Sequence, residues 1–334
     1  MPKTITRRDL LGGTAALAAS AASVAASSLA APALAQSAPR WPERPVELLV
    51  GFSPGGGTDI TARTFARFLE ARIGGTVVVN NRPGASGEIA LAAVARAKPD
   101  GHVLGMTNMP GLVTLPIERS AAQFRLDDFA YVANLVSDPS AFSVLASSPI
   151  GSLADLVQRA KRAPDSISFG STGIGTDDHL ALVLFQAAAA VRLLHVPFPG
   201  AGPLRSALLG GHVDVAGLNV GEVAASPTNL RMIAQVGAQR SPFAPDVPTL
   251  REAGFAVEMG SERGIVTAKG LPAETLARLR EATASIARDP EFQSQVRAQF
   301  TELDYLDGPA WRSRLDAADQ RFRALWAREP WSEK

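Results

Sequence analysis

The sequence of 334 residues contains no cysteine, which excludes disulfide bonds and thiolate metal sites. It also lacks an excess of charge, because 33 Lys and Arg residues are balanced by 32 Asp and Glu residues, for a formal net charge of +1 at pH 7. A large basic field is therefore absent, and we expect no nucleic-acid partner. The histidines never have the i, i+4 spacing of a helical metal site, and we expect neither a metal nor a cofactor; they are His102, His179, His195 and His212.

A long apolar run is absent outside the first 35 residues. There, a basic start with Arg7 and Arg8 precedes an alanine-rich run over residues 10–34, and Ala33-Leu34-Ala35 fits the A-x-A pattern of a cleavage site. The paired arginines, followed by two leucines, resemble a twin-arginine export signal. We therefore expect residues 1–35 to be an export signal peptide.

The alternative interpretation of this segment is an uncleaved membrane anchor. Its high content of Ala, Ser and Gly disfavours an anchor, and Pro32 interrupts its end. We therefore expect cleavage after about Ala35 and a mature protein that is soluble in the periplasm.

One stretch near the start of the mature chain organises the rest, and its pattern predicts a strand, a glycine loop and a helix. Residues 46–52 form a short apolar run with β-branched members, which is typical of a buried parallel strand. Pro54 ends the strand because it has no N–H to donate, and three glycines over residues 55–57 leave backbone N–H groups uncovered. Thr58 is expected to cap the helix that follows.

Bare N–H groups at a helix N-terminus favour an anion, so this loop is a candidate half-site for a small negatively charged group. The alternative is a tight turn without function. The loop matches neither a Walker A motif nor the G-x-G-x-x-G dinucleotide fingerprint.

A second loop over residues 169–180 repeats this design of strand, Gly/Ser/Thr loop and long helix. Thr176 is expected at its N-cap, and Ser171 and Thr172 add hydroxyl groups. His179 either contacts a ligand or fixes the loop through hydrogen bonds, and we favour the second role. Two such helix starts facing each other across a cleft suit a small molecule with a carboxylate at one or both ends.

The remaining pattern predicts two α/β units of similar size. A first β-α-β-α-β series implies a parallel sheet whose strands end at one edge, which places Asn108 beside the glycine loop. Apolar runs over residues 129–136 and 141–146 are expected as separate strands, and a new α/β series follows from Ser152. After a loop at Gly260 a short return strand is expected over residues 265–267, followed by three helices that begin near Pro272, Pro290 and Pro309.

An enzyme is the rival interpretation. The sequence contains no G-x-S-x-G elbow and no cysteine nucleophile, and the acidic pair Asp177 and Asp178 is explained by its place at a helix start. We therefore expect a binding protein and no catalytic residues.

The motifs as a set resemble the solute receptors of tripartite tricarboxylate transporters, the Bug-type extracytoplasmic binding proteins. The matching segments span nearly the whole mature chain: residues 41–45 (WPERP), 52–59 (FSPGGGTD), 81–85 (NRPGA), 98–101 (KPDG), 170–179 (GSTGIGTDDH), 195–203 (HVPFPGAGP), 209–214 (LGGHVD) and 245–254 (PDVPTLREAG). The resemblance implies an α/β periplasmic binding protein of the Venus flytrap type, with two lobes that each contain a mainly parallel sheet flanked by helices. The first lobe would comprise residues 42–141 and 264–334, and the second residues 142–263.

The resemblance also implies a monomer that binds a small organic carboxylate or dicarboxylate and delivers it to membrane permease subunits. A sensory receptor that feeds a signalling partner remains the alternative. The implied first-lobe contacts are Phe52, Ser53, Gly55, Gly56, Thr58 and Asp59, with Asn108 added from the sheet-edge argument. The implied second-lobe contacts are Ser171, Thr172, Gly173, Gly175, Thr176 and His179, with Phe198 and Gly200 nearby.

This sequence departs from the family pattern at three places. Pro199 stands where a lysine is frequent, and Asn219 lies close to a position that is commonly acidic. Residues 261–264 replace a tryptophan-containing segment, and within them Glu262 and Arg263 are expected either to pair with each other or to reach the cleft. These departures bear on the ligand and not on the fold.

The export signal gives a direct test. Replacing Arg7 and Arg8 together with lysine should leave the precursor in the cytoplasm, because the paired arginines are the feature of the signal that this change removes. Cell fractionation and immunoblotting measure the outcome. Unchanged delivery of the double variant to the periplasm would exclude the twin-arginine interpretation.

Overall fold

The structure is a computed structural model that describes residues 41–225 and 229–331. The expected signal peptide lies outside these residues. The strands are β1 (Val46–Val50), β2 (Val77–Asn81), β3 (Val103–Met106), β4 (Phe129–Leu145), β5 (Ser168–Ser171), β6 (Leu194–Pro197), β7 (Val215–Asn219), β8 (Leu230–Gln235), β9 (Gly260–Ala268) and β10 (Glu302–Asp307). The α-helices are α2 (Gly57–Ile73), α3 (Glu88–Ala95), α4 (Gly111–Glu118), α5 (Leu153–Arg162), α6 (Asp177–Ala189), α7 (Ala201–Leu209), α8 (Val220–Ala224), α9 (Ala273–Ala287), α10 (Pro290–Ala298) and α11 (Gly308–Arg328).

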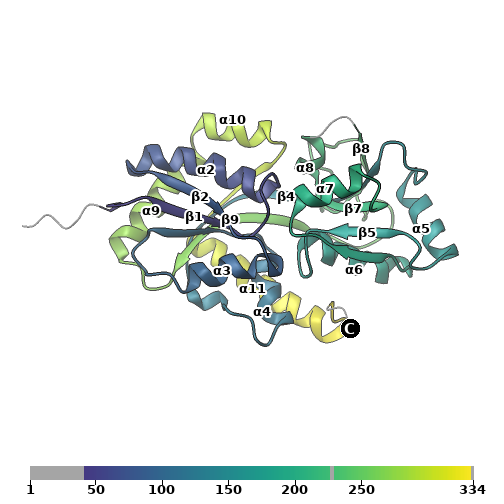
Figure 1. The fold of residues 1–334 in the computed structure, drawn as a ribbon, viewed down its shortest axis with the longest axis horizontal. Helices are drawn as coiled ribbons and strands as arrows, with labels where there is room; N and C mark the ends of the chain where they lie inside the picture. The colour runs from purple at the N-terminus through teal and green to yellow at the C-terminus, as the bar shows by residue number, and fades with distance from the viewer. Residues whose placement is uncertain (1–40, 226–228, 332–334) are drawn as a thin grey trace, which may run out of the picture. The chain divides into compact units, whose positions relative to one another are not determined.

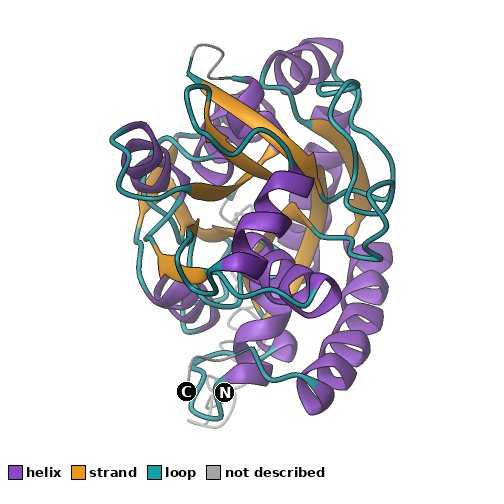
Figure 2. Cartoon of the chain, turned by 90° about the vertical axis from the view of Figure 1, so that its right-hand side faces the viewer, coloured by secondary structure: helices purple, strands orange, loops and turns teal. Residues whose placement is uncertain are grey.

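The strands of the described residues join in one mixed sheet with the order β2-β1-β3-β9-β4-β7-β5-β6, and β8 and β10 pair with β4 (Figure 1). β1 is parallel to β2 and β3, and β5 is parallel to β6 and β7. The long strands β4 and β9 run antiparallel to their neighbours. Helices cover both faces of the sheet (Figure 2). We call β1–β3 with α2–α4 and α9–α11 the first lobe, and β5–β8 with α5–α8 the second lobe.

β4 connects the two lobes as a single strand of 17 residues, so the expectation of two separate strands around a turn is wrong. Its first part pairs with β9 and its last part pairs with β7 and β8. Asp138 and Pro139 continue the strand because they pair with Ser261 and Gly260. The sequence had suggested a loop at Gly260, but Gly260 is the first residue of β9.

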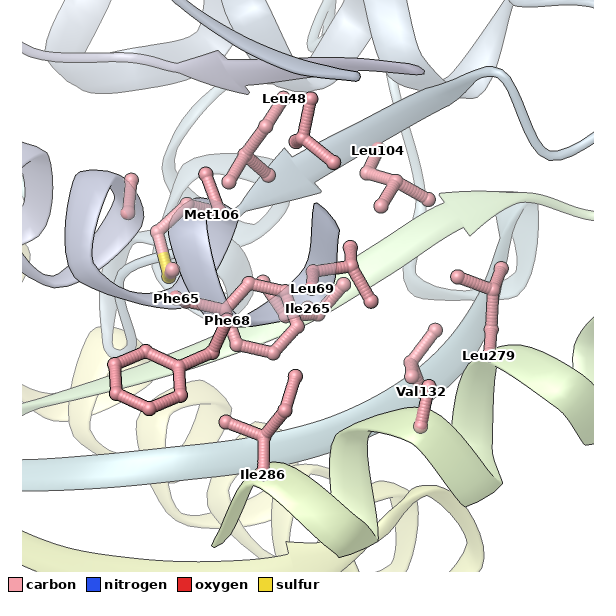
Figure 3. Packing of buried hydrophobic residues seen from close by; sticks show 14 of the residues in the cluster. Leu48, Phe65, Phe68, Leu69, Leu104, Met106, Val132, Ile265, Leu279 and Ile286 are labelled. Atoms are coloured by element: carbon pink, nitrogen blue, oxygen red, sulfur yellow. The ribbon is translucent and has the colours of Figure 1, made fainter. Parts of the chain in front are cut away.

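Each lobe has its own hydrophobic core. In the first lobe, Phe65, Phe68 and Leu69 of α2 point toward Ile265 of β9 and Ile286 of α9 (Figure 3). The spacing of the apolar residues along α2 places them on one face, which the sheet covers.

In the second lobe, the ring of Phe142 packs against Phe169 and Phe185 with centroids 4.9 Å and 5.2 Å apart. Both arrangements bury apolar surface on the sheet, which stabilises the lobe that contains it.

One helix start differs from expectation, because Gly56 and not Thr58 is the N-cap of α2. α3 begins after a 3-10 turn with Gly87 at its N-cap. Ser152 caps α5, with its side chain accepting the backbone N–H of Asp155. The short elements α4, α8 and β10 were not predicted. None of the helices in the described ranges is long and apolar enough to cross a membrane.

The packing of β9 predicts a sharp effect at Gly264. A Cβ added there would lie 2.5 Å from the ring of Trp311 and 2.7 Å from the carbonyl oxygen of Ala133. Since that ring is fully buried, Gly264→Ala should lower the free energy of unfolding by about 1–3 kcal/mol. Gly151→Ala is the matched control, because no atom lies within 4 Å of its added Cβ. Urea unfolding compares the two, and equal stabilities would contradict this packing.

Candidate functional site

The loop between β1 and α2 is held in shape by Asp59. Its carboxylate accepts the backbone N–H of Gly55 at 2.9 Å and is bound by the side chains of Arg63 and Asn81. Burial raises the pKa of Asp59, but the hydrogen bonds from Arg63, Gly55 and Asn81 outweigh burial and hold the pKa below its usual range. Asp59 therefore acts as the internal brace of the loop.

The first amide of α2 is bound by a carboxylate from the other lobe. Gly57 donates its backbone N–H to Glu222 Oε1 at 2.7 Å, and Glu222 Oε2 accepts the N–H of Asn219 at 3.0 Å within the capping box of α8. The expectation of bare amides is therefore wrong for Gly55 and Gly57. The fold brings acidic side chains to the positive end of the helix, where the dipole favours them.

The loop between β5 and α6 is closed in the same way by Asp178. Thr172 donates its backbone N–H at 2.6 Å and its hydroxyl at 2.9 Å to this carboxyl group. Thr176 occupies the N-cap position of α6, and its hydroxyl donates to the carbonyl oxygen of Gly173 at 2.6 Å. Burial and the neighbouring Asp177 raise the pKa of Asp178 to about 8. The donors that were expected to face a ligand hold the loop together.

His179 belongs to the same internal network. Its Nδ1 accepts the backbone N–H of Gly175 at 3.1 Å, and its ring lies beside that of His195 with centroids 4.4 Å apart. Ser171 Oγ lies 2.6 Å from His195 Nε2. Burial and the charge of His195 lower the pKa of His179 to about 3, so the ring stays neutral and keeps its acceptor.

Each of the two loops contacts the opposite lobe, the β1–α2 loop at the start of α7 and the β5–α6 loop at α4. Ser53 donates its backbone N–H to the carbonyl oxygen of Pro199 at 3.1 Å, and Thr114 donates its hydroxyl to the carbonyl oxygen of Gly175 at 2.7 Å. Gly202 lies so close that a Cβ added there would be 2.8 Å from the carbonyl oxygen of Pro54. The lobes are therefore closed upon each other at these loops.

Two spaces lie along this contact. The inner cavity, of about 20 Å³, has room for about one water molecule, and the mouth, of about 270 Å³, opens beside it. Phe52 and Thr172 line both spaces. The inner cavity is also lined by Gly56, Gly57, Thr58, Asn108, Asp177, Ala201, Asn219 and Glu222, and the mouth by Gly51, Gly84, Ala85, Ser86, Arg119, Gly173, Ile174, Pro197, Phe198 and Pro199.

The structure thus brings about half of the expected site residues to one of these spaces. Those that line a space are Phe52, Gly56, Thr58, Asn108, Thr172, Gly173 and Phe198. The others shape the loops from behind or meet the opposite loop: Ser53, Gly55, Asp59, Ser171, Gly175, Thr176, His179 and Gly200.

The buried cation Arg263 lies behind the inner cavity. The sequence predicted only that it would pair with Glu262 or reach the cleft. Arg263 Nη2 lies 3.2 Å from Asp138 Oδ2 and donates to Asn219 Oδ1 at 3.1 Å, with its side chain 1% exposed. Arg263 and Glu262 do not pair with each other, because alternation along β9 sends them to opposite faces and Glu262 pairs with Arg314 at 3.3 Å.

The sequence carried no signal for Asp138, which lies in the polar segment 137–140, and only a weak one for Glu222, an acidic residue within an apolar stretch. Burial raises the pKa of Asp138 to about 7, while Arg263 acts in the opposite direction. In the described part of the chain, no group of three or more His, Cys, Asp or Glu residues is arranged to hold a metal ion.

Comparison with known proteins identifies this arrangement. The model of the family described as "Tripartite tricarboxylate transporter family receptor" matches residues 61–308. A relative from Cupriavidus necator, "UPF0065 protein in gbd 5'region", is 33% identical over 289 residues, which cover 86% of this chain and 88% of the relative.

Solved structures agree with the family match. The periplasmic binding protein BugD has a TM-score of 0.82 and 28% identity, covering 88% of this chain and 100% of BugD. The structure titled "R. palustris Rpa4515 with adipate" has a TM-score of 0.82 and 27% identity, covering 86% of this chain and 97% of Rpa4515. The two-lobed α/β fold expected from the sequence is thereby confirmed.

The neutral ring of His179 predicts a pH dependence. The folded-state pKa of about 3 lies below the ordinary value of 6.5, so the unfolded chain binds the extra proton and stability falls as pH drops through 6.5 toward 3. Between pH 7 and pH 5.5 this contributes a loss of about 1 kcal/mol. His179→Asn should lack that component, whereas His212→Asn, at an exposed histidine, should retain it. Thermal and urea unfolding measure it, and parallel pH profiles for all three proteins would contradict the assignment.

Proposed function

Because the chain belongs to the tripartite tricarboxylate transporter receptor family, we propose that it captures a small carboxylate between its lobes and delivers it to the membrane subunits of such a transporter. Its relatives are periplasmic binding proteins and not enzymes, and the chain is a binding protein of the same kind. The observation that carries the proposal is that two helix-start loops, one from each lobe, line a polar inner cavity and a wider mouth.

The chemistry of the mouth supports a carboxylate. Arg119 lines it with a side chain that is 26% exposed, and Ser86 and Thr172 add hydroxyl groups. Arg119 is positioned by Glu88, whose carboxylate lies 2.7 Å from its Nη1. A guanidinium with donors to spare is well suited to a carboxylate, and the adipate bound to the related Rpa4515 is such a ligand.

Closure supports the proposal as well. The inner cavity of about 20 Å³ is too small to admit a dicarboxylate unless the lobes separate. We propose that they separate by bending at β4 and β9, the strands shared by the two lobes, with residues 42–141 and 264–334 moving against residues 142–263. Carboxylate binding would then close the cleft around the ligand.

Ligand identification is the first test. Mass spectrometry of small molecules released from freshly purified, denatured protein should reveal a carboxylate. Succinate, malate, adipate and citrate are then added one by one, and the binding ligand should raise the melting temperature, since stabilisation reaches about 2.7 kcal/mol at a hundredfold excess over Kd. Absence of a released carboxylate, together with no thermal shift for any of the four, would contradict the proposal.

Blocking closure gives a sharper prediction. Gly202→Val should place a side chain against the carbonyl oxygen of Pro54 and hold the lobes apart, lowering carboxylate affinity by at least tenfold without removing any ligand donor. Gly151→Val is the control, because it introduces the same side chain at an exposed position with no neighbour within 4 Å. Calorimetric titration measures both. Equal affinities for the two variants would show that this contact plays no part in binding.

A further inference from the structure

Glu222 has a local role as part of the cap of α8, and it also makes a second contact outside its own lobe. It caps α8 through Oε2, which accepts the N–H of Asn219 at 3.0 Å. Its other oxygen, Oε1, reaches across the boundary between the lobes to the N–H of Gly57 at 2.7 Å. Only 7% of Glu222 is exposed, so this second contact is made in a desolvated place.

The Gly57 amide is the position where an incoming anion would gain most. It is the first N–H of a helix of 17 residues, where the helix dipole favours negative charge, and Gly57 lines the inner cavity. The buried guanidinium of Arg263 lies immediately behind it, since a Cβ added to Gly57 would lie within 3 Å of the guanidinium carbon and both of its terminal nitrogens. Helix and cation together strengthen the attraction for one carboxylate at this amide.

We propose that Glu222 is a built-in competitor for the carboxylate ligand: it occupies the Gly57 amide itself, latches the lobes together, and is displaced from that amide when the ligand binds. This inference rests on the proposed function, because it concerns the same cleft. Glu222 thereby sets the affinity of the site and limits it to ligands whose carboxylate outcompetes an intramolecular one.

The location of Glu222 explains why it can act in this way. It sits on the second lobe and Gly57 on the first, so separation of the lobes necessarily breaks their hydrogen bond and uncovers the amide. Asp59 and Asp178 brace amides within their own lobes, and separation leaves those bonds intact. Glu222 is thus the carboxylate among these three whose contact depends on closure.

The charges around the inner cavity require the ligand to displace Glu222 from the Gly57 amide. Asp177 and Glu222 both line it, and no cation is among the residues that do. A ligand carboxylate placed beside a Glu222 that kept its contact with Gly57 would meet like charge in a buried place, which is strongly unfavourable. The ligand must therefore replace the Glu222 oxygen and cannot add to it.

The test uses Glu222→Gln, which keeps the shape of the side chain and removes its charge. A neutral amide oxygen accepts a weaker hydrogen bond from Gly57, so the variant should bind the tightest member of the panel of succinate, malate, adipate and citrate about tenfold more tightly, equal to about 1.4 kcal/mol. Glu70→Gln is the matched control: Glu70 also accepts a backbone N–H, from Val77 at 2.8 Å, but within the first lobe. Its affinity should equal that of the parent.

A second measurement needs no ligand. Small-angle scattering of the protein without added carboxylate should give a larger radius of gyration for Glu222→Gln and Glu222→Ala than for the parent and Glu70→Gln, since the latch is weakened or lost. Circular dichroism confirms that each variant is folded.

The outcomes separate the two proposals. If the parent binds a carboxylate and Glu222→Gln binds it equally or more weakly, Glu222 is not a competitor, while the proposed function stands. If no member of the panel binds the parent, the proposed function fails for these ligands. The scattering measurement alone then tests whether Glu222 holds the lobes together. Identical scattering curves for the parent and both Glu222 variants would overturn it.

Discussion

The buried ion pair between Arg263 and Asp138 is the contact on which the arrangement of both lobes depends. It joins β9 to β4 where these strands pass from one lobe to the other, and each side chain is 1% exposed. Asp138 also accepts the N–H of Gly221 at 3.0 Å, which ties the start of α8 to the same point. A buried charge left without its partner costs several kcal/mol, so these elements are bound to one geometry.

From this ion pair the site is built outward. Arg263 supports the first turn of α2 and fixes Asn219, while Asn219 donates its side-chain N–H to Asp177 at 2.8 Å at the start of α6. The starts of α2, α6 and α8 thus converge on one cluster of buried polar groups. Such clusters tolerate little change, because removal of one member leaves the buried polar groups that it binds without a partner.

The structure also changes the picture of how an anion is held. The backbone amides at the glycine-rich helix starts were expected to be free to bind a ligand. Instead, the amides of Gly55 and Gly57 are bound by the carboxylates of Asp59 and Glu222. Buried N–H groups rarely stay without a partner, and a folded chain supplies partners where it can. In a receptor of this design, the ligand carboxylate replaces a carboxylate of the protein at the same amide. The affinity then reflects the difference in free energy between these two hydrogen bonds.

The sequence by itself determined the fold class, most strand and helix positions, and the two loops at the lobe boundary, because apolar periodicity and glycine placement are local signals. It did not reveal that β4 is one strand through Asp138 and Pro139, nor that Glu222 crosses to Gly57 over 165 positions of sequence. Those facts depend on partners that meet only in the folded chain. A polar segment resembles a turn until β9 pairs with it, and an acidic residue resembles a helix cap until the opposite lobe presents an amide.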